Sequence, residues 1–151
     1  MANKVFEGLG VQRPFGLHLT LDGYGGPKEK LADLKFVKRF LDELPHLLKM
    51  QKISAVNAIW YDGGDKLEDC GISGFVMIAE SHISIHTFSE KGFLTADVYS
   101  CKPFDTAKAI KFFKKEFELK DLEINLVKRG LKFPRTEIST KPTIQLPLAS
   151  N

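Results

Sequence analysis

Residues 72–101, "ISGFVMIAESHISIHTFSEKGFLTADVYSC", consist of three β-type segments that follow one another closely. Apolar and β-branched residues are frequent in 72–79, 81–88 and 93–101, as is typical of strands. The sequence "SEKG" at 89–92 separates the last two segments and predicts a hairpin turn. The stretch therefore predicts three neighbouring strands, joined by short connections, in a mainly antiparallel sheet.

The middle segment has two different faces. Strict alternation in 81–88 places Ile83 and Ile85 on one face of the strand. The other face carries His82, Ser84, His86 and Phe88, and it is too polar to belong to a core. One face of the sheet is thus expected to pack against helices, while the other needs a cover or a function.

Three further segments outside this stretch predict strands. Leucines alternate with polar residues in 15–22, before a glycine-rich turn, and 54–61 ("SAVNAIWY") is the next β-type segment. The polar, glycine-punctuated sequence "DGGDKLEDCG" that follows predicts a loop. The last strand is expected at 122–130.

Two segments predict amphipathic helices. Apolar residues recur at spacings of three and four between Leu31 and Leu48, and Pro45 predicts a break or a kink near the end of this helix. A second helix is expected at 105–117, with Asp105 as its N-cap. Its predicted inward side chains are Ala109, Phe113 and Phe117.

The predicted order β-α-β-β-β-β-α-β indicates an α+β fold. We expect a two-layer sandwich, in which a mainly antiparallel sheet carries both helices on one face. Residues 1–130 are predicted to form a single domain, since 151 residues suit one core better than two. Residues 131–151 hold three of the seven prolines and are predicted to be an extended or flexible C-terminal tail.

Composition restricts the partners of the chain. The charged fraction is 27% with a formal net charge of +3, and basic and acidic residues are interspersed, so we expect no nucleic acid and no membrane as partner. No apolar run approaches the ~20 residues of a membrane span, and the first ten residues lack the apolar core of a signal peptide. A cytoplasmic location is therefore expected. There, Cys70 and Cys101 should remain free thiols.

The histidines and serines of 81–88 are compatible with three kinds of chemistry. A hydrolase could use Ser81 or Ser84 as nucleophile, but no G-x-S-x-G elbow surrounds them, and the odd offset places Ser81 and His86 on opposite strand faces. A metal site from His82, His86 and Glu90 is disfavoured. Histidines four residues apart on a strand are separated by about 13 Å, so we predict no metal.

The third possibility is an attack of Ser81 on the chain itself. The Ser81 hydroxyl can add to the preceding carbonyl of Glu80 and convert the amide to an ester, if a strained turn holds the backbone. β-Elimination of that ester would cut the chain. It would leave residue 81 as a pyruvoyl group.

The motifs around Ser81 closely resemble the short bacterial and archaeal class of S-adenosylmethionine decarboxylase proenzymes. "GISG", Glu-Ser-His, Ile-His-Thr, "ADV" and a cysteine twenty residues after the serine match in order and spacing. Weaker similarity extends to "GLHLTLDGYGG" near the start and to "KRG" at 128–130. The resemblance therefore covers most of the chain.

This resemblance implies a function and a set of site residues. Cleavage between Glu80 and Ser81 would give a β chain of 1–80 and an α chain of 81–151, whose pyruvoyl group forms a Schiff base with the substrate amine. His86 and Ser73 match the family residues that assist processing, and Cys101 matches the proton donor. The implied reaction is decarboxylation of S-adenosylmethionine in polyamine biosynthesis, with the pyruvoyl group as cofactor. The implied assembly is a homodimer of cleaved protomers.

The substrate-binding positions depart from the family pattern. Where the family commonly has His-Thr-Trp-Pro-Glu this chain has "HTFSE", so Phe88 replaces a tryptophan, whereas Glu90 keeps the acid that would bind the ribose hydroxyls. Leu67 and Asp69 replace an aromatic residue and a proline near the adenine. Pyruvoyl-dependent decarboxylation of ornithine or arginine is therefore the alternative function. A catalytically idle regulatory homologue is disfavoured, because such a chain has no need of the cleavage serine.

Overall fold

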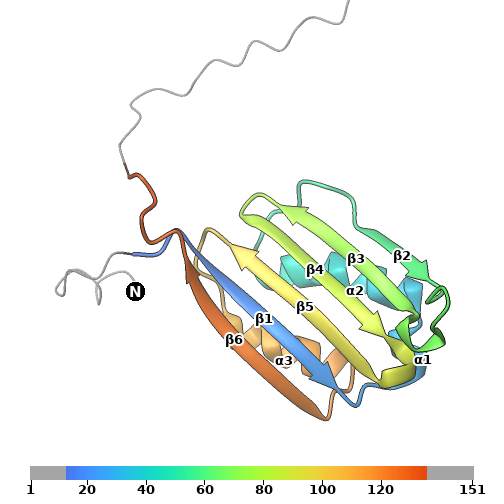
Figure 1. Ribbon diagram of the computed structural model, residues 1–151. Coiled ribbons are helices and arrows are strands. Elements are labelled where there is room, and N and C mark those ends of the chain that lie inside the picture. The colour runs from blue at the N-terminus through green and yellow to red at the C-terminus, as the bar shows by residue number, and fades with distance from the viewer. Residues whose placement is uncertain (1–12, 136–151) are drawn as a thin grey trace, which may run out of the picture.

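The computed structural model describes residues 13–135, which are built around a six-stranded antiparallel sheet (Figure 1). The strand order across the sheet is β2-β3-β4-β5-β1-β6, and every neighbouring pair is antiparallel. The strands are β1 (Gly16–Tyr24), β2 (Asn57–Tyr61), β3 (Gly71–Ile78), β4 (Ser81–Phe88), β5 (Phe93–Ser100) and β6 (Asp121–Arg129). The predicted central trio of strands is confirmed as β3, β4 and β5.

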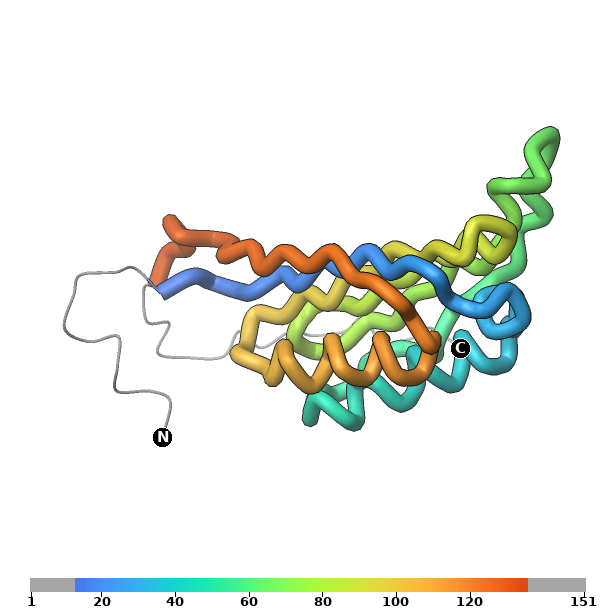
Figure 2. Tube along the Cα trace, turned by 90° about the horizontal axis from the view of Figure 1, so that it is seen from below, coloured from blue at the N-terminus to red at the C-terminus, as the bar shows by residue number. Residues whose placement is uncertain are grey.

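Two substantial helices cover one face of this sheet, as Figure 2 shows. They are α2 (Leu34–Leu47) and α3 (Thr106–Glu116), and a third, single-turn helix is α1 (Lys28–Leu31). Two short 3₁₀ helices, η1 (Leu67–Asp69) and η2 (Ser89–Lys91), precede β3 and β5. The predicted α+β class, with an antiparallel sheet and the helices on one side, is confirmed.

The first predicted helix is divided into two. The helix is interrupted at Asp33, whose carboxylate accepts a hydrogen bond of 3.0 Å from the Phe36 amide, so that α2 begins at Leu34. Leu31 belongs to α1 instead. At the other end, Pro45 lies inside the last turn of α2, which ends two residues later at Leu47. The second predicted helix is confirmed closely, and the Asp105 carboxylate accepts a hydrogen bond of 2.9 Å from the Lys108 amide.

The second predicted strand is shorter than expected, because residues 54–56 do not join the ladder. β2 begins at Asn57. The Ser54 hydroxyl oxygen accepts a hydrogen bond of 3.0 Å from the Met77 amide and so satisfies a donor on the adjoining strand. A side chain there replaces a backbone partner, which a propensity argument does not detect.

The core lies between the helix-covered face of the sheet and helices α2 and α3. Alternate residues of the central strands are fully buried, among them Ile83 and Ile85, as predicted. Ala109, Phe113 and Phe117 are buried as predicted as well, and Phe113 packs against Phe40 with ring centroids 4.7 Å apart.

Removing one of these rings should strongly destabilise the protein. Phe113 is 0% exposed, so Phe113→Ala is expected to lower the free energy of unfolding by about 3–5 kcal/mol. Urea denaturation followed by circular dichroism measures this change. Lys111→Ala, at an exposed position of the same helix, is the matched control and should change the free energy by less than about 0.5 kcal/mol. Equal effects of the two substitutions would contradict the assigned core.

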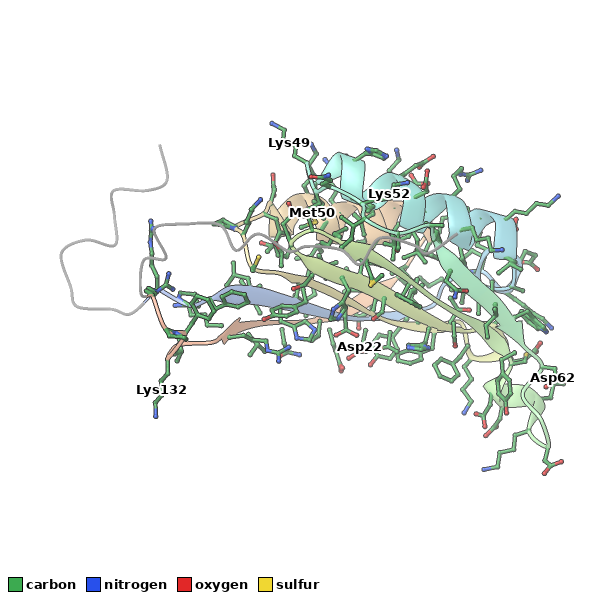
Figure 3. All side chains as sticks on the ribbon, turned by 90° about the horizontal axis from the view of Figure 1, so that it is seen from above. Asp22, Lys49, Met50, Lys52, Asp62 and Lys132 are labelled. Atoms are coloured by element: carbon green, nitrogen blue, oxygen red, sulfur yellow. The ribbon has the colours of Figure 1, made fainter. Side chains whose placement is uncertain are left out.

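The opposite face of the sheet, called the open face below, carries no helix within residues 13–135. In Figure 3, Asp22 lies on the open face and points away from the helices. Asp62 lies in the loop that follows β2. Near the β2 edge the open face is apolar. Its large exposed side chains there are Ile59, Tyr61, Phe75 and Met77.

Of the predicted C-terminal tail, only residues 131–135 lie among the described residues. They follow β6 and return to the start of β1. The Phe133 and Phe15 rings are in contact, with centroids 4.4 Å apart, and the Arg135 guanidinium donates a hydrogen bond of 2.6 Å to the Arg13 carbonyl. Residues 136–151 lie outside the described residues.

Candidate active site

Ser81 is the first residue of β4 and follows the tight turn that joins β3 to β4. Its φ angle is +153°, in a region of backbone space that residues with a Cβ rarely adopt. This conformation is strained, and it occurs at the peptide bond where the sequence predicts cleavage. A peptide bond held in strain is closer in energy to the ester that would replace it.

The carbonyl of Glu80, which Ser81 would attack, is already hydrogen-bonded. The Cys101 amide donates to the Glu80 carbonyl oxygen at 2.8 Å. An amide aimed at this oxygen polarises the carbonyl and stabilises the negative charge that develops when a nucleophile adds to its carbon. β4 and β5 are directly paired, with Ser81 opposite Ser100, and this register brings Cys101 beside the Glu80–Ser81 bond.

The Glu80 side chain is also held in place. The residue is only 7% exposed. Its carboxylate accepts a hydrogen bond of 3.4 Å from the Gln51 amide and forms a 3.4 Å ion pair with the Lys102 ammonium group. The Cys101 thiol, a half-buried free cysteine, completes this group of residues, called the cleavage end below: Glu80, Ser81, Cys101 and Lys102.

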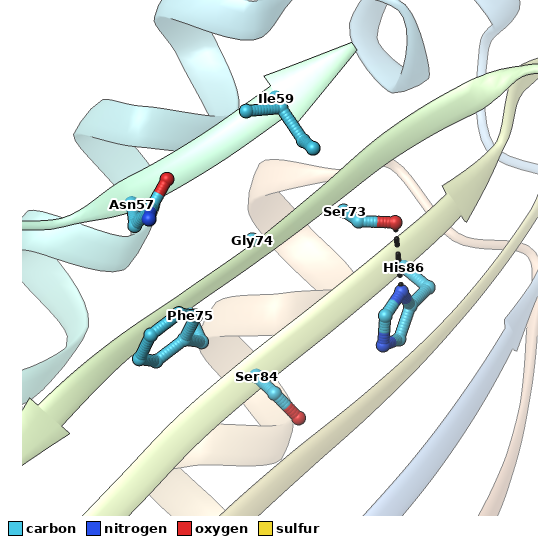
Figure 4. A pocket seen from close by; sticks show the side chains of 7 residues that line it. All are labelled: Asn57, Ile59, Ser73, Gly74, Phe75, Ser84 and His86. Atoms are coloured by element: carbon cyan, nitrogen blue, oxygen red, sulfur yellow. Dashed lines mark hydrogen bonds between the residues drawn. The ribbon is translucent and has the colours of Figure 1, made fainter. Parts of the chain in front are cut away.

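Ser73 and His86 lie together at the other end of the β3–β4 hairpin. They face each other across the ladder, and a hydrogen bond of 3.0 Å joins the Ser73 hydroxyl to Nδ1 of His86 (Figure 4). Both side chains line a hollow of about 340 Å³ in the open face. Figure 4 shows the residues of β2, β3 and β4 that line it. The pairing of the two predicted processing residues is thus present.

His86 and Ser81 of one chain are nevertheless far apart. His86 lies five positions along an extended strand from Ser81, which corresponds to about 16 Å. The side chain of His86 therefore cannot reach the Glu80–Ser81 bond of its own chain. The predicted site residues divide into the cleavage end and a second group at the opposite end of β4.

The four predicted substrate-binding residues belong to this second group, called the binding end below. Phe88 closes β4, Glu90 lies in η2, and Leu67 and Asp69 lie in the adjoining η1. Leu67 is 70% exposed. The Glu90 carboxylate forms an ion pair of 2.6 Å with Lys28, which raises the pKa of the lysine through the hydrogen bond and the carboxylate charge.

Sequence and structure comparisons agree on one family. The family described as "S-adenosylmethionine decarboxylase" matches residues 17–130. The chain belongs to this family. The S-adenosylmethionine decarboxylase proenzyme of Pyrococcus furiosus is 32% identical over 117 residues, which cover 77% of this chain and 79% of that protein. The proenzyme of a Sulfurihydrogenibium species is 30% identical over 80% of this chain and 86% of its own length.

A solved structure supports the same assignment. The crystal structure of the adenosylmethionine decarboxylase from Aquifex aeolicus superposes with a TM-score of 0.66 at 28% sequence identity, covering 85% of this chain and 99% of that one. The resemblance inferred from the motifs around Ser81 is thereby confirmed, as is the prediction of a carboxy-lyase. No helix within residues 13–135 is long and apolar enough to cross a membrane.

An S-adenosylmethionine decarboxylase needs no hydrolase nucleophile, and within residues 13–135 the two candidates, Ser81 and Ser84, are not paired with a histidine. The Ser84 hydroxyl donates to the Asp97 carboxylate at 3.2 Å, and His86 is hydrogen-bonded to Ser73 instead. Asp97 also binds His18, with 2.6 Å between Oδ1 and Nε2. Sequence reasoning gave neither Asp97 nor His18 a role, although both lie in the motifs "ADV" and "GLHLT" that carried the resemblance.

The three candidate metal ligands considered in the sequence are spread along the whole of β4 and beyond its end. His82 and His86 lie four residues apart on β4, and Glu90 lies in η2 beyond its end. His82 contacts the Tyr99 ring instead, with centroids 5.7 Å apart. Within the described residues, no three histidine, cysteine or acidic side chains are grouped as metal ligands.

Proposed function

We propose that this S-adenosylmethionine decarboxylase cuts itself between Glu80 and Ser81 and works with the pyruvoyl group so formed. The observation that carries the proposal is the Glu80 carbonyl, which accepts a hydrogen bond from the Cys101 amide directly beside a strained Ser81. The relatives' description as proenzymes, which are precursors of active enzymes, supports it. The pyruvoyl group would form from Ser81 itself, so it would be held covalently at the cleavage end, beside Cys101.

The proposed cleavage balances without any external oxidant or reductant. Addition of the Ser81 hydroxyl to the Glu80 carbonyl carbon, followed by cleavage of the C–N bond and protonation of the nitrogen, replaces the amide by an ester. Removal of the Ser81 Cα proton then breaks the Cβ–Oγ bond, releases the Glu80 carboxylate and leaves a dehydroalanine at residue 81. A proton moves from its nitrogen to Cβ to give an imine, water hydrolyses the imine, ammonia leaves, and residue 81 is a pyruvoyl group.

The chain's other residues take separate roles in the proposed reaction. When present, the pyruvoyl carbonyl supplies an acceptor for the electrons that remain when CO₂ leaves the substrate. Cys101, next to the carbonyl of residue 80, donates the proton that replaces the carboxylate; thiols have a reference pKa of about 8.5, suitable for proton donation near neutral pH. Glu90 accepts hydrogen bonds from the ribose hydroxyls, and Phe88, Leu67 and Asp69 line the adenosyl site.

We propose that two chains complete each site. Because about 16 Å separates Ser81 from His86 within β4, the cleavage end of one chain requires the Ser73–His86 pair of another. Face-to-face packing of two open faces about a two-fold axis, with their β4 strands antiparallel, brings each cleavage end over the other chain's binding end. Such an isologous contact produces two identical sites.

The open face has the composition that such a contact needs. Exposed Ile59, Phe75 and Met77 supply apolar area at the edge that carries β2 and β3, and an apolar surface of this kind is typical of homodimer interfaces. Nearer the centre of the sheet, the Asp97 carboxylate is hydrogen-bonded to Ser84 and His18. Its burial between two sheets would therefore not leave a carboxylate without hydrogen-bond partners.

Mass spectrometry combined with a substrate panel tests the proposed function. The purified protein should give two fragments, residues 1–80 and 81–151, and the second should resist N-terminal sequencing because it has no amino group. CO₂ release should be measured with S-adenosylmethionine, ornithine, arginine and lysine. We expect at least a hundredfold preference for S-adenosylmethionine. A chain that stays intact on prolonged incubation would contradict self-processing, and preferential turnover of ornithine or arginine would contradict the proposed substrate.

A further inference from the structure

The proposed cleavage creates a new negative charge at Glu80. Before the reaction the backbone carbonyl of Glu80 is neutral, and the side-chain carboxylate is the residue's one charge. Elimination releases the acyl group as a second carboxylate, now the C-terminus of the fragment 1–80. Two negative charges then lie on one residue, which is only 7% exposed in the uncut chain. Burying carboxylates without a compensating cation is unfavourable.

Lys102 is placed to compensate this charge. Its ammonium group lies 3.4 Å from Oε1 of Glu80, and its neighbour Cys101 donates the amide hydrogen bond to the carbonyl oxygen that becomes part of the new carboxylate. One two-residue segment thus contacts both oxygen-bearing groups of Glu80. The segment supplies a cation on one side and a backbone donor on the other.

The backbone of Lys102 is held firmly for this task. Its amide donates to the Ser100 hydroxyl oxygen at 3.0 Å, and that hydroxyl donates in turn to the Lys102 carbonyl at 2.7 Å. Ser100 is fully buried and lies opposite Ser81 in the β4–β5 ladder. The Lys102 side chain is 70% exposed, however, so solvent screens its charge and the ion pair contributes little to the stability of the uncut protein.

We propose that Lys102 is a positioning residue for self-cleavage, which aligns Glu80 before the reaction and stabilises the carboxylate that the reaction releases. The inference rests on the proposed function, because it concerns the cleavage that forms the pyruvoyl group. It adds a residue that the motifs around Ser81 did not single out. The role is electrostatic, so arginine should retain most of it and a neutral side chain should not.

Cleavage kinetics provide the first test. Cell-free synthesis followed by intact-mass measurements gives the rate at which full-length chain disappears. We expect Lys102→Gln to slow cleavage about threefold to tenfold, and Lys102→Arg to restore most of the rate. Raising NaCl to 1 M should reduce the difference between the wild type and Lys102→Gln, since salt screens an exposed cation. Lys111→Gln, an exposed lysine on α3, is the matched control and should cleave at the wild-type rate.

Thermal unfolding provides a second test that a merely structural role would not satisfy. Lys102→Gln should lower the Tm of the cleaved protein more than it lowers the Tm of the uncut Ser81→Ala protein, because the second carboxylate exists after cleavage alone. Equal shifts in both proteins, together with an unchanged cleavage rate, would overturn the role of Lys102. If the wild type itself stays uncut, the proposed function fails, and this outcome is distinct from a failure of the Lys102 inference.

Discussion

Replacing Ser81 with alanine should leave all of the protein as one uncut chain and abolish the release of CO₂ from S-adenosylmethionine. Without the Ser81 hydroxyl no ester forms at Glu80, and without that ester no pyruvoyl group arises. Intact-mass analysis and a CO₂ assay on the same preparation measure the two effects. The fold should persist, because the helix-covered core does not depend on the hydroxyl.

Ser84→Ala is the matched control for this experiment. Ser84 lies three residues further along β4, and its hydroxyl contacts Asp97 rather than the scissile bond. We expect the Ser84→Ala chain to be cut between Glu80 and Ser81 as in the wild type. Fragmentation of the Ser81→Ala protein at residue 80, or an uncut Ser84→Ala protein that is fully folded, would contradict the assignment of Ser81 as the attacking residue.

Mixing two inactive variants should restore cleavage, if each site is completed by two chains. His86→Ala retains Ser81 but lacks the histidine, and Ser81→Ala retains the histidine but cannot be cut. Each variant alone should remain uncut. In a mixed dimer, the intact His86 of the Ser81→Ala chain lies over the cleavage end of the His86→Ala chain. With equal amounts and random pairing, about half of the His86→Ala chains should be cut.

Differential tags on the two variants identify which chain is cut. Fragments should arise from the His86→Ala chain alone, since the other lacks the attacking hydroxyl. A mixture of His86→Ala with the double variant Ser81→Ala/His86→Ala, in which no chain supplies the histidine, is the control and should stay uncut. If the co-refolded mixture forms dimers without any cleavage, the contribution of His86 across the interface is wrong. Dimer formation is measured independently by light scattering.

The local pattern of the chain was sufficient for most of the fold. The period-two alternation around Ile83 and Ile85 predicted which sheet face is buried, and Asp105 marked the start of α3 correctly. The predictions were less accurate where a side chain competes with the backbone for a hydrogen bond. Asp33 divides the first helix by capping α2, and Ser54 takes a donor of β3 and thereby shortens the second strand.

The order of residues along the chain was enough to predict the proposed chemistry at Ser81, because the two residues that would react, Glu80 and Ser81, are consecutive in the chain. The division of the site residues between the two ends of β4 follows from strand pairing and was not predicted. Pairing of β4 with β5 brings Cys101 and Lys102 to the Glu80 carbonyl. The straightness of β4 holds His86 about 16 Å from Ser81. Which residues lie side by side across a sheet depends on the register of the strands, and the pattern of residues along one strand does not specify that register.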